Sequence, residues 1–365
     1  MATSSSSSKC GVRYIGNCGL KVSNLCLGAM TFGSTEGAMF HLPGQSDEAA
    51  SHAILDKFVE MGGNFIDTAD IYSAGRSESI VGSWLQKQAR EQIVIATKVR
   101  FPMGAGPNDV GLSRKHILSA VEESLKRLNT SYIDLYQTHA WDDGTPIEET
   151  LSTLTDLVRQ GKVRYLGLSN VTGWQLQKII DLTKYKHYEP FVSLQVQYNL
   201  MCRETEWELG EVCKREGLGI LPWSPLKTGW LTGKVTRSGA PEGSRVEHQG
   251  KDDTAKLPFL RDYAKEEQTW QILDVLKAVA EESGKSIPQV ALKWLLHQET
   301  VSSVVIGAKK MEQLVDNMGA GDDSWKLTAD QLKRLGDVSD IMPLYPYSIM
   351  DAVQVQRRRN GLLVL

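Results

Sequence analysis

Four side chains that can hold or move a proton lie at the ends of strand-like segments: Asp67, Tyr72, Lys98 and His139. A free tyrosine has a pKa of about 10, which is too high for ready proton release at neutral pH. A nearby lysine ammonium favours the phenolate and lowers that pKa, and a carboxylate can hold the lysine in place. With a histidine to orient the acceptor, this set predicts proton delivery to a carbonyl oxygen.

Each of these residues also has a purely structural interpretation when it is considered alone. An aspartate at a strand end often caps the next helix, and a lysine there often reaches solvent. His139 could be a hydrogen-bonded structural residue, and Tyr72 could be a core residue with a solvated hydroxyl. Their joint position favours catalysis, because neighbouring strands lie about 4.8 Å apart and their side chains can converge.

Short apolar segments alternate with segments of helical periodicity along the chain. The helical segments span residues 46–63, 114–129, 147–163 and 266–283. The apolar segments are typical of parallel strands buried on both faces, and they span residues 25–30, 64–69, 93–99, 132–139, 163–170, 192–199, 219–225 and 302–308. Eight strands alternating with helices predict an α/β fold, a (β/α)8 TIM barrel with reactive groups at the carboxyl strand ends. A doubly wound sheet is the alternative, but its GxGxxG motif is missing.

The chain divides into three predicted regions. Residues 1–10 are Ser-rich and expected to be disordered, residues 11–342 form the barrel, and residues 343–365 form a C-terminal tail. A β-hairpin is expected at the start of the barrel region, before its first strand. A polar insertion after the seventh strand, at about residues 227–265, is expected to be a long loop or a lid.

Composition argues against several classes of protein. The 365 residues carry a net charge of -3 with acidic and basic residues mixed, which predicts no nucleic-acid partner and no anionic membrane surface. Five cysteines without a CxxC pair indicate neither a disulfide framework nor a zinc site, and favour the reducing cytoplasm. No apolar run has the length of a membrane span, and the start lacks the pattern of a secretion signal.

The motifs FIDTADIYSAGRSE, ATKV, DLYQTH, GLSN and QVQYNL together resemble those of aldo-keto reductases, from about residue 12 to about residue 340. WSPLKTGWLTGK and IGAKKMEQLVDN resemble the branch with bacterial-type reductases, aryl-alcohol dehydrogenases and potassium-channel β subunits. Asp67, Tyr72, Lys98 and His139 match the catalytic set of the family in order. The resemblance implies reversible reduction of aldehydes and ketones, with hydride from a nicotinamide and a proton from Tyr72.

The resemblance also implies a nicotinamide cofactor bound without a Rossmann fold. Trp223 is expected to stack on the nicotinamide, and Lys309 and Lys310 to bind a 2'-phosphate, which favours NADPH or NADP+ over NAD. Alternatively, these two lysines simply begin a solvated helix. The other expected contacts are Ser169, Asn170 and Gln195 to the carboxamide, Ser224, Pro225, Leu226, Lys234 and Arg245 to phosphate, Gln313 and Asn317 to adenosine, and also Ala29, Met30, Asp67 and Gly307.

The substrate pocket is less well determined by the sequence. Met30, Phe101 and Trp141 follow strand ends and predict an apolar pocket mouth beside Tyr72 and His139, or else they pack under loops. An aromatic, medium-chain or sugar-derived carbonyl compound would fit. A second hypothesis is a regulatory NADP(H)-binding module like the channel β subunits. Against it, this chain has His139, which those subunits lack, and a long N-terminal inactivation segment is missing. The tail at 343–365 has no counterpart in the family.

Overall fold

The computed structural model describes residues 10–33, 45–242, 244, 246–247, 263–350 and 353. Within them, eight parallel strands form one sheet in the order β10-β3-β4-β5-β6-β7-β8-β9. The strands are β3 (Leu25–Gly28), β4 (Phe65–Asp67), β5 (Val94–Val99), β6 (Ile133–Thr138), β7 (Val163–Ser169), β8 (Phe191–Gln197), β9 (Gly219–Trp223) and β10 (Val304–Ile306). Seven of the predicted strand segments contain one of these strands, and the segment 192–199 overlaps β8, which begins one residue earlier at Phe191.

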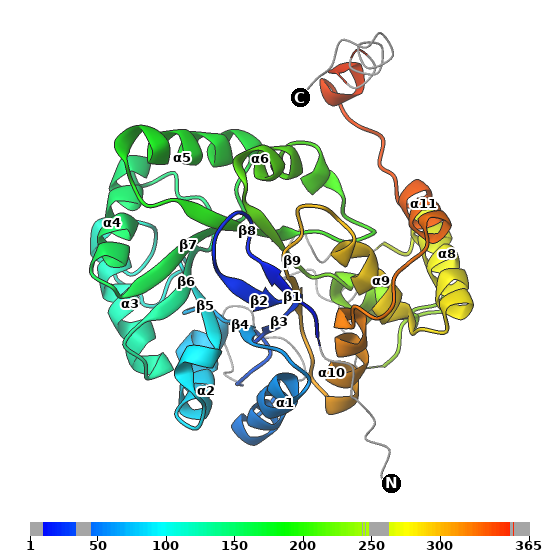
Figure 1. Cartoon of the computed structure of the whole chain (residues 1–365), viewed down its shortest axis with the longest axis horizontal. Helices are drawn as coiled ribbons and strands as arrows, with labels where there is room; N and C mark the ends of the chain where they lie inside the picture. The colour runs from blue at the N-terminus through cyan, green and yellow to red at the C-terminus, as the bar shows by residue number, and fades with distance from the viewer. Residues whose placement is uncertain are drawn as a thin grey trace.

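The two edge strands of the sheet meet, and their contact nearly closes the barrel. Ile220 of β9 forms a parallel bridge with Val301, just before β10. The backbone N–H of Ile220 donates to the Thr300 carbonyl at 2.7 Å, and the Ser302 N–H donates to the Ile220 carbonyl at 3.0 Å. The predicted (β/α)8 barrel is therefore confirmed, and Figure 1 shows the strands at the centre with helices around them.

Helices connect the strands and cover the outer face of the barrel (Figure 1). They are α1 (Glu48–Glu60), α2 (Arg76–Leu85), α3 (Arg114–Leu128), α4 (Ile147–Arg159), α5 (Gly173–Lys186), α6 (Leu209–Glu216), α8 (Glu267–Ser283), α9 (Ile287–Leu296), α10 (Met311–Met318) and α11 (Ala329–Val338). Local capping explains where some of them begin. The side chains of Asp47 and Ser113 accept backbone N–H groups of the first turns of α1 and α3, respectively.

An antiparallel hairpin, β1 (Val12–Tyr14) and β2 (Lys21–Ser23), precedes the barrel as predicted. Its Ile15 and Val22 are fully buried, and they join an apolar cluster inside the barrel. The barrel residues of this cluster are Cys26, Phe65, Val94, Ala96, Leu135, Val192, Leu221 and Val305. Because most of these residues lie toward the beginnings of their strands, the hairpin covers the amino end of the barrel, opposite the expected site.

Much of the predicted loop at 227–265 lies outside the described residues, as do residues 1–9 and most of the C-terminal tail. The described part of the loop contains a 3-10 helix, η4 (Lys227–Thr232). Cys10, the first described residue, is buried and its Sγ donates to Asn24 Oδ1 at 2.9 Å. The first described residues of the tail include Tyr347, whose ring stacks on Trp207 with centroids 5.6 Å apart. The domain boundaries stay predictions.

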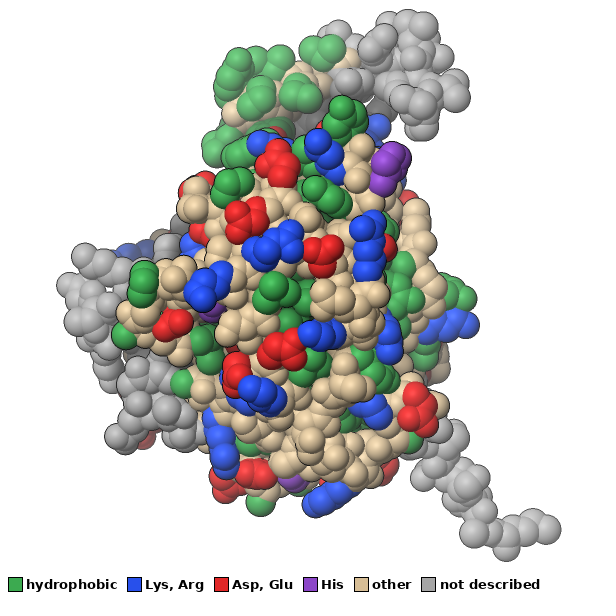
Figure 2. All heavy atoms as spheres, turned by 90° about the vertical axis from the view of Figure 1, so that its left-hand side faces the viewer, with side chains coloured by type: hydrophobic (Ala, Val, Ile, Leu, Met, Phe, Trp, Pro, Cys, Tyr) green, Lys and Arg blue, Asp and Glu red, His purple; other side chains and the backbone are tan. Residues whose placement is uncertain are grey.

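The surface shows no concentration of a single charge on the face seen in Figure 2, where basic and acidic side chains are mixed with apolar ones. None of the described helices combines the length and the apolar character that crossing a membrane requires.

Replacing Ile15 with alanine tests whether the hairpin is a structural plug. The change removes a fully buried side chain, and we expect the free energy of unfolding to fall by about 2–5 kcal/mol. Val12, on the same hairpin, is 58% exposed, so Val12→Ala should change the free energy of unfolding by less than about 0.5 kcal/mol. Urea denaturation measures both variants, and equal effects would contradict the plug.

Candidate active site

Asp67 at the end of β4 and Lys98 in β5 form a buried ion pair toward the carboxyl end of the barrel. Lys98 Nζ lies 2.5 Å from Asp67 Oδ2, and the two residues are 0% and 2% exposed. The same ammonium donates to the Thr68 carbonyl at 2.9 Å and to the Tyr72 hydroxyl at 3.3 Å. These three acceptors match the three N–H donors of the ammonium, so its charge is fully solvated by protein groups.

Two glutamine amides bind the other carboxylate oxygen of Asp67. Nε2 of Gln137 on β6 lies 2.9 Å from Asp67 Oδ1, and Nε2 of Gln195 on β8 lies 2.8 Å from it. Gln195 was predicted to bind a carboxamide, but in this structure its amide N–H groups face Asp67. Gln137 is absent from the residues predicted from the sequence. Its alternation with the buried Leu135 along the strand is the signal that could have found it.

Tyr72 lies in η1 (Tyr72–Gly75), a short 3-10 segment after β4. Its backbone N–H donates to the Ala69 carbonyl at 3.2 Å, and this turn directs the phenol toward Lys98. The ring of His139, which follows β6, packs edge-on against the Tyr72 ring with centroids 5.7 Å apart. The four residues predicted to be catalytic are therefore brought together from three neighbouring strands.

Burial determines the protonation of this group. Desolvation raises the pKa of Tyr72 above its usual value, because it outweighs the attraction of Lys98. Lys98 does lower this pKa, as predicted, but the expected net fall toward neutral pH is wrong because burial raises the pKa by more. Burial also lowers the pKa of His139 well below its usual value, with help from the cations Lys98 and Arg100. At neutral pH the site holds a neutral phenol and a neutral imidazole.

The pKa of Lys98 moves the other way. Burial alone would lower it, but Asp67 and Tyr72 together hold the pKa of Lys98 above its usual value. The ammonium therefore stays charged beside the phenol. This arrangement provides a proton donor next to a fixed cation that can stabilise the phenolate left after proton transfer.

The residues predicted to hold a nicotinamide lie at the ends of β7, β8 and β9. Ser169 Oγ donates to the Gln195 carbonyl at 2.8 Å. Asn170 Nδ2 donates to the His139 carbonyl at 2.9 Å, and Trp223 Nε1 donates to Asn170 Oδ1 at 3.2 Å. Asn170 thus fixes the indole of Trp223 and connects it to the backbone of His139.

The loop after β9 has an unusual backbone. Ser224, Lys227 and Thr228 have φ angles of 52°, 46° and 55°, in the left-handed region that costs a non-glycine residue about 1–3 kcal/mol and is common at functional sites. Pro225 and Leu226 lie between these residues, and Lys234 follows η4. Lys227, which was not predicted, is 1% exposed, with Nζ 4.7 Å from the centroid of the Tyr263 ring. Arg245 lies outside the described residues.

The segment between β10 and α10 contains the residues predicted to bind phosphate and adenosine. The backbone N–H groups of Lys309 and Lys310 donate to Gln313 Oε1 at 3.0 and 3.2 Å, so Gln313 caps the helix here. Asn317 is 4% exposed and donates weakly to the Gly307 carbonyl at 3.5 Å. Gly307 is exposed, and no atom lies within 4 Å of the position that a side chain would take there.

The residues predicted for the substrate pocket separate into two groups. Met30 and Phe101 pack against the cluster that contains Tyr72, and the Phe101 ring centroid lies 4.8 Å from that of His139. Ala29, which was predicted to contact the cofactor, is fully buried in the main hydrophobic core, and its N–H donates to the Asp67 carbonyl at 2.8 Å.

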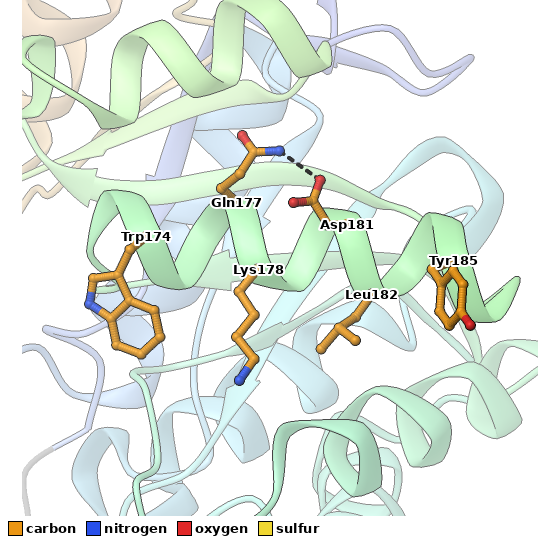
Figure 3. Close-up of a pocket in the computed structure, with 6 residues that line it drawn as sticks. All are labelled: Trp174, Gln177, Lys178, Asp181, Leu182 and Tyr185. Atoms are coloured by element: carbon orange, nitrogen blue, oxygen red, sulfur yellow. Dashed lines mark hydrogen bonds between the residues drawn. The ribbon is translucent and has the colours of Figure 1, made fainter.

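Trp141 belongs to the second group, because its ring packs against Trp174 of α5 with centroids 5.6 Å apart. Trp174 also borders a surface hollow on the outer side of α5, which Figure 3 shows. The hollow is lined by Trp174, Gln177, Lys178, Asp181, Leu182 and Tyr185. It contains none of the predicted site residues, so it is separate from the strand-end site.

Comparison with known proteins identifies the family. The model of the aldo/keto reductase family matches residues 24–340. The chain belongs to the aldo/keto reductase family. This match covers the barrel that carries Asp67, Tyr72, Lys98 and His139.

Individual relatives have oxidoreductase and channel names. A protein of Bacillus subtilis strain 168 named uncharacterized oxidoreductase YrpG is 37% identical over 89% of this chain and 94% of its own length. Aryl-alcohol dehydrogenase (NADP(+)) of Phanerodontia chrysosporium is 35% identical over 90% of this chain and 86% of its own. A putative voltage-gated potassium channel subunit beta of Schizosaccharomyces pombe is 36% identical over 91% and 94%, respectively. The family and the first two names support an oxidoreductase role for this aldo/keto reductase.

A second carboxyl group is buried behind Tyr72. Asp70 is 0% exposed, its Oδ1 accepts the Ile71 N–H at 2.6 Å, and its Oδ2 has no hydrogen-bond partner among the described residues. Burial, followed by repulsion from Glu78, raises the pKa of Asp70 well above its usual value. The folded protein therefore keeps a proton that the unfolded chain loses above about pH 4. The free energy of unfolding falls as pH rises from there through the folded pKa.

Asp70→Asn should remove this dependence, because asparagine is neutral at all pH values. We expect the variant to gain stability relative to the original protein as pH rises above about 4, with the gain levelling off only above the folded pKa. Thermal unfolding at a series of pH values measures the difference. Asp274→Asn, which changes an exposed residue of α8, is the matched control. A stability difference for Asp70→Asn that stays constant with pH would contradict a protonated Asp70.

Proposed function

We propose that this chain is an NADPH-dependent reductase that reversibly converts aldehydes and ketones to alcohols. The observation that supports this most directly is the Tyr72 hydroxyl, which lies 3.3 Å from the ammonium of Lys98 in a buried site. A bound nicotinamide would supply the hydride, which the side chains of this chain cannot provide. In the reverse direction the same groups would oxidise an alcohol with NADP+.

Tyr72 acts in this proposal as the proton donor to the carbonyl oxygen. As negative charge develops on that oxygen, the phenol transfers its proton, and Lys98 stabilises the resulting phenolate. Asp67 keeps Lys98 charged and in place through the 2.5 Å contact. His139 is a neutral imidazole and orients the carbonyl oxygen through a ring nitrogen.

Several features suit a bound NADPH. The indole of Trp223, held by Asn170 at 3.2 Å, offers a flat face for the nicotinamide ring. The space at Gly307 and the start of α10 suit a phosphate, and Lys309 and Lys310 would favour the 2'-phosphate that distinguishes NADPH from NADH. The relative from Phanerodontia chrysosporium, whose name includes NADP(+), supports the same choice.

The substrate in this proposal is a small-molecule carbonyl compound. Met30 and Phe101, which pack beside Tyr72, would form the apolar wall of its pocket, and Trp141 would contribute only at the outer rim. All five cysteines are free thiols, which suits a reducing compartment, and we therefore place the enzyme in the cytoplasm. No nucleic-acid partner or membrane attachment is part of the proposal.

Replacing Tyr72 with phenylalanine removes the proton donor and preserves the ring. We expect kcat for NADPH-dependent aldehyde reduction to fall by about 10²–10⁴-fold, with the dissociation constant of NADPH nearly unchanged. Loss of NADPH absorbance across aryl, aliphatic and sugar aldehydes measures turnover, and fluorescence titration measures binding. Tyr185→Phe, at a residue 76% exposed on α5, is the control. Full activity of the Tyr72 variant would exclude the assigned role.

The pH dependence of reduction follows from the two shifted groups. Because burial raises the pKa of Tyr72 and lowers that of His139, both stay neutral through the physiological range. We expect kcat/KM for reduction to be flat between about pH 6 and pH 9 and to decline only above about pH 10, where Tyr72 loses its proton. A rate that changes with an apparent pKa near that of free histidine would contradict this assignment.

A second candidate function is a regulatory NADP(H)-binding module that resembles a channel β subunit. The observation in its favour is the Schizosaccharomyces pombe relative, named as such a subunit and aligned over 94% of its length. The two candidates make different predictions for the unmodified protein. NADPH binding without turnover of any aldehyde, together with co-purification of a membrane partner, would favour the module.

A further inference from the structure

Arg100 stands directly after β5, two residues beyond Lys98, in an unusual backbone conformation. Its φ angle is 153°, in a region that glycine adopts readily and other residues adopt rarely. The Arg100 carbonyl accepts the Gly111 N–H at 2.8 Å, so the far side of the loop holds this conformation. Such strain beside a reactive group is common at functional sites.

The guanidinium of Arg100 contacts the ring of Phe101 and the backbone of Trp141, the two aromatic residues predicted for the pocket mouth. Its Cζ is 5.6 Å from the centroid of the Phe101 ring, and its Nε donates to the Trp141 carbonyl at 3.3 Å. Phe101 in turn contacts the ring of His139. The positive charge therefore lies at the rim of the site, one aromatic ring away from the residue that would hold the substrate carbonyl. It also helps to lower the pKa of His139.

Most of the N–H donors of this guanidinium have no hydrogen-bond acceptor within the part of the chain that the structure describes. An arginine has five N–H donors in one plane, and the Nε–Trp141 bond uses one of them. Asp142 on the adjacent loop interacts with the charge of Arg100, which helps to lower the pKa of this carboxyl group. Its oxygens, however, accept the N–H groups of Leu112 and Gly144 and the hydroxyl of Thr145. Arg100 is partly exposed, and its two Nη groups form the fork that binds a carboxylate through two hydrogen bonds.

We propose that Arg100 is a substrate-specificity residue that binds a carboxylate on the substrate. The inference rests on the proposed reductase function and names its substrate class, which is aldehydes and ketones with a carboxylate remote from the carbonyl. The carbonyl would lie at Tyr72 and His139, the intervening carbon chain or ring would pack on Phe101, and the carboxylate would meet Arg100. A neutral substrate of the same shape would use the first two contacts only.

The test compares 4-carboxybenzaldehyde with its neutral methyl ester, methyl 4-formylbenzoate. We expect the unmodified enzyme to prefer the acid by about tenfold or more in kcat/KM, because a hydrogen bond to a charged group contributes more than one to a neutral group. Arg100→Gln should lower kcat/KM for the acid by about 10–100-fold, mainly through KM. Its kcat/KM for the ester should stay within about twofold. Arg100→Lys, which keeps the charge and loses the fork, should be intermediate.

Arg215→Gln, at an exposed arginine of α6, is the matched control and should leave kcat/KM unchanged for both the acid and the ester. Arg100 also has a purely structural candidate role, in which it braces the Trp141 loop. Equal losses for acid and ester in Arg100→Gln would favour the brace and overturn the proposal. Absence of a preference for the acid in the unmodified enzyme would also overturn it.

A binding measurement separates this proposal from the reductase function itself. Calorimetric titration of the protein with 4-carboxybenzaldehyde, without NADPH, reports binding in the absence of turnover. If the unmodified protein reduces no aldehyde but Arg100→Gln binds 4-carboxybenzaldehyde more weakly than it does, the reductase function is rejected and the anion site is supported. Turnover without any effect of Arg100→Gln on titration or kinetics would keep the reductase and reject the anion site.

Discussion

The ion pair between Asp67 and Lys98 is the interaction on which the site depends. Both groups are removed from water, and two buried charges persist only when protein groups replace the water that they lose. Here the Lys98 ammonium has three acceptors and Asp67 has two further amide donors, from Gln137 and Gln195. The Tyr72 hydroxyl is one of those three acceptors, so the position of the phenol is fixed by its hydrogen bond to a buried cation.

The barrel makes this arrangement possible because it separates an apolar layer from a polar one along the same strands. Phe65, Ala96 and Leu135 pack with the hairpin toward the amino end, and two residues further along each strand Asp67, Lys98 and Gln137 form the polar layer. The apolar layer excludes water from below, which strengthens the electrostatic interactions above it. The register of β5 and β6 pairs Lys98 with Gln137, and a shift of this register would therefore disrupt the site as well as the sheet.

Burial and charge divide the roles of the titratable groups. Lys98 stays charged because Asp67 faces it, whereas Tyr72 and His139 stay neutral because desolvation dominates their pKa values. A neutral phenol beside a permanent cation is a proton donor whose product is stabilised in advance. The same site has a second cation at its rim, Arg100, separated from His139 by the ring of Phe101. We propose that Lys98 serves the chemistry and that Arg100 selects the substrate.

The sequence alone was sufficient to predict the barrel, the hairpin, and the meeting of Asp67, Tyr72, Lys98 and His139 at the strand ends. These features follow from local patterns, namely the alternation of strands and helices and the position of each residue at or just after the end of a strand. Only the tertiary structure decided the direction of the Tyr72 pKa shift, the hydrogen bond from Gln137 to Asp67, and the hydrogen bond from Trp223 to Asn170. Each of these depends on how much water is excluded and on which side chains from distant segments converge. The exclusion of water and the convergence of distant side chains are not properties of any short stretch of sequence, because both arise only when the sheet closes.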